Sequence, residues 1–148
     1  MIQRIQSIYL ILAVAALGLQ FVFPFASSPE SMSTATAMAD GVFNLNDSMI
    51  LLISTGVALA LAVFAVFLFK NRPVQSRITS LGMFASTILA VALAVQYILL
   101  LQQMGPSSTS MHLQAGIGMP ALSVFMLWLA NRAIRKDEAL VRSSERLR

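Results

Sequence analysis

The chain has 148 residues, the size of a single domain. Apolar residues make up 57% and charged residues only 11%, whereas soluble domains carry about 25% charge, so water is not predicted to be the main solvent. The net charge of +4 would suggest a nucleic-acid partner if it were spread over a soluble face. The lack of cysteine excludes disulfides, thiolate metal sites and cysteine redox chemistry.

The first two apolar windows are each long enough for one membrane span. The chain from Ile5 to Pro29 contains no charged residue, and neither does the chain from Ser48 to Phe69. A bilayer core about 30 Å thick needs roughly 20 helical residues. The sequence therefore predicts helices over Ser7–Phe25 and Met49–Phe69.

The first of these segments follows Arg4, as a secretory signal peptide would. Its apolar run is longer than the core of about 7–15 residues that such signals use, and Pro24 and Pro29 disfavour cleavage near its end. We therefore expect the first span to be retained.

The loop between these two helices, residues 26–48, has a mixed character. Ser, Thr, Ala and Met dominate Ser27–Ala39, which indicates irregular structure. Asp40 and Gly41 indicate a turn, and Val42–Leu45 is either a short strand or a segment at the membrane interface.

A third uncharged window, Ile78–Asn131, is about twice the length that one span needs. A Gly-Pro pair and a Ser/Thr cluster within Gln102–His112 indicate a turn that divides it. We predict helices over Ile78–Leu101 and Leu113–Ala130. All four predicted helices are apolar on every side, whereas helices of a soluble bundle carry a polar stripe, so each is predicted to cross a membrane.

The basic residues predict the orientation of the four spans. With four spans, residues 1–6, 70–77 and 131–148 share one side, and residues 26–48 and 102–112 share the other. All ten Lys and Arg residues lie in the first set, and the acidic residues are divided evenly. By the positive-inside rule, both termini are cytoplasmic.

The tail, residues 131–148, is predicted to continue the last helix, since Glu138 and Arg142 form a favourable i,i+4 pair. It either docks a partner or anionic lipid, or it is a solvated helix whose charges only set the orientation. A nucleic-acid role is disfavoured, because acidic residues interrupt the basic run and no aromatic side chain is available for stacking. The residues predicted to contact lipid headgroups or a partner are Arg4, Lys70, Arg72, Arg77, Arg132, Arg135 and Lys136.

Three segments carry a resemblance that extends over the whole chain: MIQRIQSIYL at the start, LFKNRPVQSRI from Leu68, and LANRAIRKDEALVRSSERLR at the end. They resemble a family of small four-span membrane proteins of Bacteroidetes, catalogued as domain of unknown function 4293. The resemblance implies a four-helix protein of the inner membrane of a Gram-negative bacterium. It implies no established activity and therefore no catalytic residues.

Small residues predict where the spans pack, because membrane helices associate through close approach of their backbones. The third span carries a stripe of Gly82, Ser86, Ala90 and Ala94, and the second carries Gly56 and Ala60, with Ala58 and Ala62 on a neighbouring face. The short loop 70–77 makes these two spans antiparallel neighbours. We expect the two stripes to pack together; the alternative is an interface between copies of the chain.

Gly116 and Pro120 predict a bend in the first half of the fourth span, because Pro120 cannot donate a hydrogen bond to the carbonyl of Gly116. Ser123 or Gln114 is available to pair with the freed backbone groups. The bend either lines a small cavity for lipid or quinone or is an ordinary proline bend of a membrane helix.

The chemistry that usually marks transport or catalysis is missing. No span contains Asp, Glu, Lys or Arg, so a proton-coupled exporter is not predicted. The single histidine, His112, lies at the predicted membrane edge, and no phosphate loop, HExxH or GxSxG motif is present. Gln20, Gln96 and Gln114 are expected to form hydrogen bonds between helices. We predict no catalytic residue, no cofactor and no metal ligand.

The sequence thus predicts one all-α domain over residues 1–148, an integral membrane four-helix bundle of two antiparallel hairpins with a helical cytoplasmic tail. An accessory or structural subunit of an inner-membrane assembly is the first functional hypothesis, with lipids and either a protein partner or a second copy as its contacts. The alternatives are a small carrier or pore for an apolar or neutral solute and a lipid- or quinone-binding protein. An enzyme acting on lipid or quinone ranks last.

Overall fold

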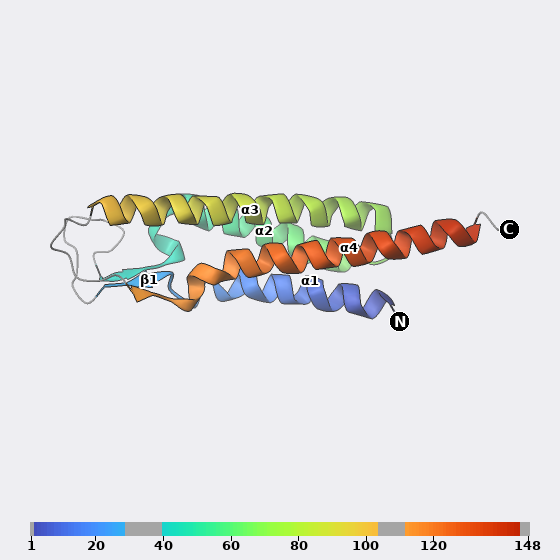
Figure 1. Cartoon of the computed structure of the whole chain (residues 1–148), viewed down its shortest axis with the longest axis horizontal. Helices are drawn as coiled ribbons and strands as arrows, with labels where there is room; N and C mark the ends of the chain where they lie inside the picture. The colour runs from blue at the N-terminus through green and yellow to red at the C-terminus, as the bar shows by residue number, and fades with distance from the viewer. Residues whose placement is uncertain (1, 29–39, 104–111, 146–148) are drawn as a thin grey trace.

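The computed structural model describes residues 2–28, 40–103 and 112–145. Its helices are α1 (Ile2–Leu19), α2 (Met49–Phe67), α3 (Arg72–Gln103) and α4 (Met119–Glu145). They run antiparallel in turn along one long axis, and the N and C labels lie at the same end (Figure 1). We call this end the terminal end; the opposite end, which carries three short strands, is the sheet end.

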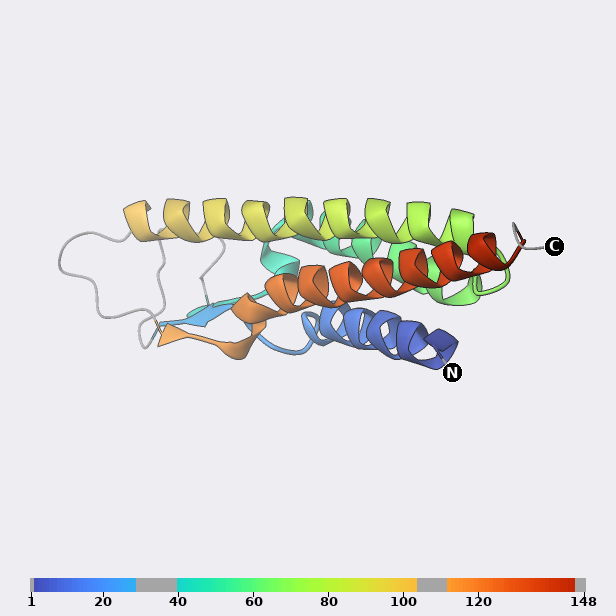
Figure 2. The ribbon, with the colours of Figure 1, turned by 45° about the vertical axis from the view of Figure 1, so that its right-hand side comes forward.

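The four helices form a closed ring: each packs on its neighbours in the chain, and α1 packs on α4 to close the ring. Helix α1 contacts α2 and α4, and α3 contacts α2 and α4. The views in Figures 1 and 2 agree that α3 and α1 lie on opposite sides of α4. The predicted all-α bundle of two antiparallel hairpins is confirmed, and so is the helical tail, which continues α4 as far as Glu145.

The helix bounds differ from the predicted ones for local reasons. Helix α1 ends at Leu19 rather than Phe25: the N–H of Val22 donates to the carbonyl of Leu19 at 3.1 Å in a tight turn, and Pro24 follows. Helix α3 begins at Arg72, earlier than Ile78, with Pro73 in its first turn, where the missing N–H costs nothing. At 32 residues, α3 is about 48 Å long.

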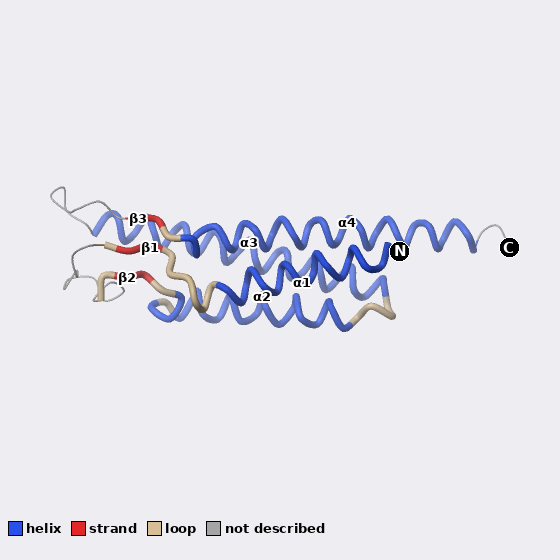
Figure 3. Tube along the Cα trace, turned by 90° about the horizontal axis from the view of Figure 1, so that it is seen from below, coloured by secondary structure: helices blue, strands red, loops and turns tan. Residues whose placement is uncertain are grey.

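A small antiparallel sheet closes the sheet end (Figure 3). It consists of β1 (Ala26–Ser27), β2 (Val42–Phe43) and β3 (His112–Leu113), and β1 is the central strand. Ala26 pairs with both Phe43 and Leu113. Of the two interpretations of Val42–Leu45, the strand is correct for its first two residues, and a 3₁₀ turn, η2 (Leu45–Asp47), follows them. No sequence pattern predicts that these three separate segments meet in one sheet.

The core runs through the whole bundle into this sheet. Leu10 and Leu17 of α1, Leu51 of α2, Leu89 of α3 and Leu127 of α4 are fully buried. At the sheet end the rings of Phe25 and Phe43 lie 5.6 Å apart in a tilted arrangement and are also fully buried. The strands therefore extend the apolar core beyond the ends of α1 and α2.

Candidate functional site

The predicted packing stripe of α3 falls partly on the contact with α2. Gly82 and Ser86 are buried, and a Cβ atom added at Gly82 would lie 3.5 Å from Cβ of Leu61 and 3.8 Å from the backbone nitrogen of Ala62. Further along the helix, Ala90 is half-buried and Ala94 is exposed. Gly82 is the position where the two backbones approach.

On α2 the structure selects a different face from the predicted one. Gly56 and Ala60 are exposed, and nothing lies within 4 Å of a Cβ atom added at Gly56. The buried positions of α2 are Leu51, Thr55, Ala58, Ala62 and Ala65. Gly56 and Ala60 thus lie outside the contact between α2 and α3 in the single chain. Because α2 carries small residues on two adjacent faces, its neighbours α1 and α3 together decide which face is buried.

Gly116 and Pro120 do not bend the middle of a helix, so the predicted kink is corrected. A 3₁₀ turn, η3 (Ala115–Gly118), precedes α4, and Pro120 lies in the first turn of α4, where helix N–H groups have no intrahelical acceptor in any case. The Ser123 hydroxyl donates to the carbonyl of Pro120 at 2.7 Å. Gln114 pairs with the sheet instead, through a side-chain bond of 2.9 Å to the hydroxyl of Ser27.

An apolar cavity of about 380 Å³ lies at this start of α4, between α4 and α3. Ala90, Leu93, Ala94, Tyr97 and Ile98 line it from α3, and Ile117, Pro120 and Ala121 line it from η3 and α4. Its volume is within the range of small-molecule sites, about 300–1,000 Å³. The predicted stripe residues Ala90 and Ala94 leave room for this cavity, because their side chains end at Cβ.

Polar side chains tie the helices together near the terminal end, a feature that the sequence did not predict. The Ser76 hydroxyl donates to Oδ1 of Asn131 at 2.9 Å, and Nδ2 of Asn131 donates to Oγ of Ser80 at 3.0 Å. Gln75 reaches from α3 to the carbonyl of Ala65 on α2 at 2.9 Å. The sequence predicts Gln75 and Ser76 in a loop, Ser80 in an apolar span and Asn131 in the tail. Only the i,i+4 spacing of Ser76 and Ser80 indicates a shared helix face.

A further tie joins the two terminal helices: Nε2 of Gln6 in α1 donates to the carbonyl of Ala133 in α4 at 3.2 Å. Gln20 behaves differently from the prediction. Its side chain is 1% exposed, and neither atom of its amide has a hydrogen-bond partner among the described residues. The expected bond between helices is therefore absent for Gln20.

The basic residues predicted to face lipid or a partner lie at the terminal end. Arg72 pairs with Asp137 of α4 at 3.2 Å, Nζ of Lys70 lies 5.9 Å from the ring centre of Phe69, and Arg77 is exposed. Arg4 belongs to α1, but its side chain is outside the described part of the structure.

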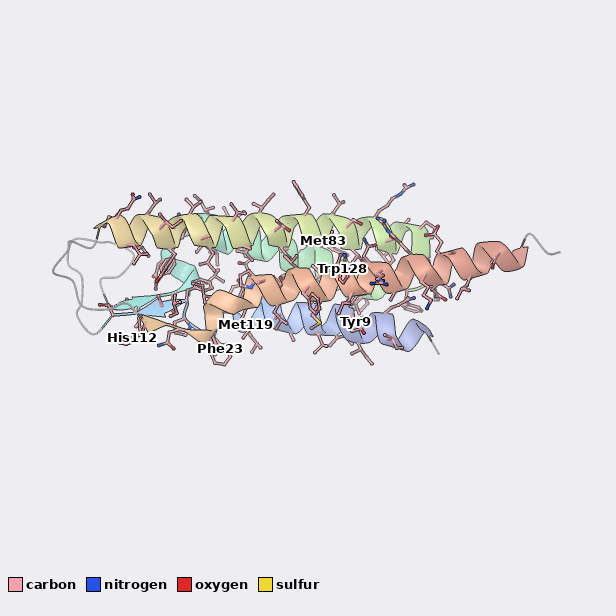
Figure 4. All side chains as sticks on the ribbon, viewed as in Figure 1. Tyr9, Phe23, Met83, His112, Met119 and Trp128 are labelled. Atoms are coloured by element: carbon pink, nitrogen blue, oxygen red, sulfur yellow. The ribbon has the colours of Figure 1, made fainter. Side chains whose placement is uncertain are left out.

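On α4, Arg132, Arg135 and Lys136 are exposed. The guanidinium of Arg132 lies 5.7 Å from the ring centre of Trp128. Arg135 lines an open recess of about 290 Å³ together with Ser76, Glu138 and Ala139. Figure 4 shows Trp128 along α4 and His112 at the sheet end. His112 is exposed, and within residues 2–28, 40–103 and 112–145 no three His, Asp or Glu side chains are grouped as metal ligands.

The fold and its exposed apolar side chains define the class of protein: an all-α bundle whose apolar helices are compatible with a membrane protein. Three helical segments, Met49–Phe67, Arg72–Gln103 and Ala115–Val141, are long and apolar enough to cross a membrane, and Ile5–Leu19 is a shorter apolar helix. The chain matches a family described as a domain of unknown function, DUF4293, over residues 2–147, and it belongs to that family. No curated protein and no solved structure matches it.

Proposed function

We propose that the protein is a non-enzymatic integral protein of the bacterial inner membrane, with four spans and cytoplasmic termini, that serves as an accessory or structural subunit. The proposal rests chiefly on the end of α4. Beyond the buried Ile134, α4 continues from Arg135 to Glu145, about 16 Å of helix. On this extension Leu140 is 49% exposed, so the helix offers an apolar side chain between charged ones to a partner.

The membrane location is supported by the outer surface of the bundle. Large apolar side chains are exposed on every helix, for example Ile8, Phe64, Phe84 and Phe125. Soluble proteins rarely expose apolar patches larger than about 600 Å². In a membrane, lipid acyl chains would cover these side chains, so they would not be exposed to water. Helix α1, of 18 residues, is about 27 Å long, near the lower limit for a span.

The orientation is supported by the distribution of charge over the fold. In the described side chains, Lys70, Arg72, Arg77, Arg132 and Arg135 all belong to the half of the bundle that holds the termini. At the sheet end, the described charged residues are Asp40 and Asp47. This distribution satisfies the positive-inside rule if the terminal end is cytoplasmic.

Affinity purification from membranes in a mild detergent tests the role as a subunit. The unsubstituted chain should recover a partner in stoichiometric amount, and Leu140→Glu should reduce the recovery at least tenfold because it places a charge in an apolar contact. Ala139→Glu, which adds the same charge at the neighbouring exposed residue, about 100° around the helix from Leu140, should not change it. A monodisperse protein that never retains a partner contradicts the proposal.

The cavity between α3 and α4 supports a second candidate function, the binding or passage of an apolar or neutral molecule such as a lipid or quinone. Its lining is apolar apart from the hydroxyl of Tyr97. Ala94→Phe should fill the cavity and abolish uptake of a labelled quinone into proteoliposomes, or its binding by them. Ala60→Phe, at an exposed position of α2, should leave both unchanged. Equal effects of the two substitutions exclude the cavity as the site.

A further inference from the structure

Four side chains form a ladder along the outer face of α4. Phe125, Trp128, Arg132 and Arg135 follow one another at spacings of three, four and three residues, which places them on one side of the helix. The rings of Phe125 and Trp128 stack at 6.2 Å with an interplanar angle of 24°, and they are 52% and 45% exposed. The ladder therefore changes from apolar to cationic toward the terminal end.

The cationic half of this ladder has an excess of positive charge. Arg132 is held over the ring of Trp128 at 5.7 Å, and Arg135 lines the recess that Ser76 of α3 also borders. Two carboxylates lie nearby: Asp137 is already paired with Arg72 at 3.2 Å, and Glu138 lines the same recess as Arg135. Together with Arg72, the exposed Arg132, Arg135 and Lys136 carry four positive charges here, against the two negative charges of Asp137 and Glu138.

The position of Trp128 sets the depth of this face in a membrane. Trp side chains prefer the level where the hydrocarbon core meets the headgroups. Each headgroup layer is about 5–8 Å thick. Arg132 and Arg135 follow Trp128 along the helix by about 6 Å and 10 Å, so they lie at and just above the level of lipid phosphates. Lys70, which lies over Phe69, repeats the pairing of a cation with an aromatic ring at the same end.

We propose that this face of α4 binds one anionic phospholipid, with its phosphate between Arg132 and Arg135 and its acyl chains along Trp128 and Phe125. The inference rests on the membrane location proposed above and adds the class of lipid and the residues that select it. Charge complementarity favours a lipid with net negative charge over a zwitterionic one. In a zwitterionic lipid the ammonium group already offsets the charge of the phosphate, so the lipid does not neutralise the arginines.

Trp128, the only tryptophan in the chain, reports on this site directly. The full chain is reconstituted in phosphatidylcholine vesicles that contain brominated phosphatidylglycerol or, in parallel, brominated phosphatidylcholine, and the quenching of its fluorescence is measured. We expect phosphatidylglycerol to compete for the site at least fivefold better. Arg135→Gln, which does not touch Trp128, should lower this selectivity about fivefold, equivalent to about 1 kcal/mol.

The matched control is Arg142→Gln, which removes the same charge from the same helix about 10 Å beyond Arg135. It should retain the selectivity. Equal quenching by the two lipids in the unsubstituted protein, or equal losses in the two variants, overturns the lipid site while leaving the membrane location intact. If neither lipid quenches Trp128, the membrane location fails as well. Circular dichroism of each variant establishes that it is folded.

Discussion

At Gly116 the absence of a side chain allows the backbone before the sheet to approach the backbone before α4 closely. Its N–H donates to the carbonyl of Pro24 at 3.1 Å. A Cβ atom there would lie 2.5 Å from the carbonyl oxygens of both Phe23 and Pro24. The chain that leaves α1 therefore passes directly against the turn that starts α4. The sequence predicts a helix bend at this glycine, but its role in the structure is this close contact of two backbones.

We expect Gly116→Ala to destabilise the fold by about 1–3 kcal/mol, because backbone atoms rather than a flexible side chain must move to admit the methyl group. The measurement is the free energy of unfolding in detergent, followed by circular dichroism. Gly118→Ala is the matched control, since nothing lies within 4 Å of its added Cβ atom. Equal stabilities for the two variants would contradict the close contact.

Asn131 forms polar contacts between α4 and α3. It accepts a hydrogen bond from Ser76 and donates one to Ser80, and it is buried. Its amide therefore holds α4 to two successive turns of α3.

Asn131→Ala should cost about 1–2 kcal/mol of unfolding free energy, since it leaves two hydroxyl groups without this partner. Thr87→Ala is the comparison: the Thr87 hydroxyl is exposed and donates only to the carbonyl of Met83 in its own helix, at 2.9 Å. Its loss should change stability by less than about 0.5 kcal/mol. The same unfolding measurement in detergent compares both variants. A similar loss of unfolding free energy in the two would show that the contacts of Asn131 with α3 do not stabilise the fold.

At the level of elements, the pair α2 and α3 illustrates how packing selects one of two small-residue faces. Gly82 of α3 lies against Leu61 and Ala62, whereas Gly56 of α2 lies in the open. Both glycines occur in helical stripes of small residues, so their spacing alone does not predict which of them is buried. The separation follows from the ring of four helices, in which α2 must bury the side that faces α1 and α3 together.

Replacing each of these two glycines with leucine should therefore affect the unfolding free energy differently. Gly82→Leu should destabilise the bundle by about 1–3 kcal/mol through overpacking between α2 and α3. Gly56→Leu should leave the unfolding free energy of the single chain unchanged or slightly higher, because glycine is a poor helix former. If copies of the chain associate through the outer face of α2, light scattering will show a smaller particle for Gly56→Leu alone.

At the scale of the whole molecule, the up-and-down order of four helices brings both ends of the chain together. Since the chain has no cysteine, single cysteines can be introduced without a background. Ser143 is exposed near the end of α4, and His112 is exposed at the sheet end, where Figure 4 labels it.

We expect His112→Cys to react with a membrane-impermeant maleimide in intact cells whose outer membrane has been made permeable. Ser143→Cys should react only after the inner membrane is disrupted, because the proposed orientation places the basic end of the bundle in the cytoplasm. Labelling before and after lysis gives the comparison for each position. Labelling of Ser143→Cys in intact cells would contradict the proposed orientation.

The candidate sites were only partly predictable. The sequence singled out Arg132 and Arg135 because basic residues cluster outside the spans, and it drew attention to Pro120 because proline interrupts a helix. It did not reveal the recess beside Ser76 or the stack of Phe125 on Trp128. A cavity and a stack depend on the rotation of one helix against another, and no local pattern of residues encodes that rotation.

The sequence by itself determined the number of helices, their antiparallel order and the apolar character of the surface, because long uncharged windows and turn residues act locally along the chain. The tertiary structure alone decided that Ala26 pairs with both Phe43 and Leu113, that α2 turns Gly56 outward, and that Asn131 meets Ser76. These contacts join residues far apart in the chain, and their partners are selected only when all four helices pack at once.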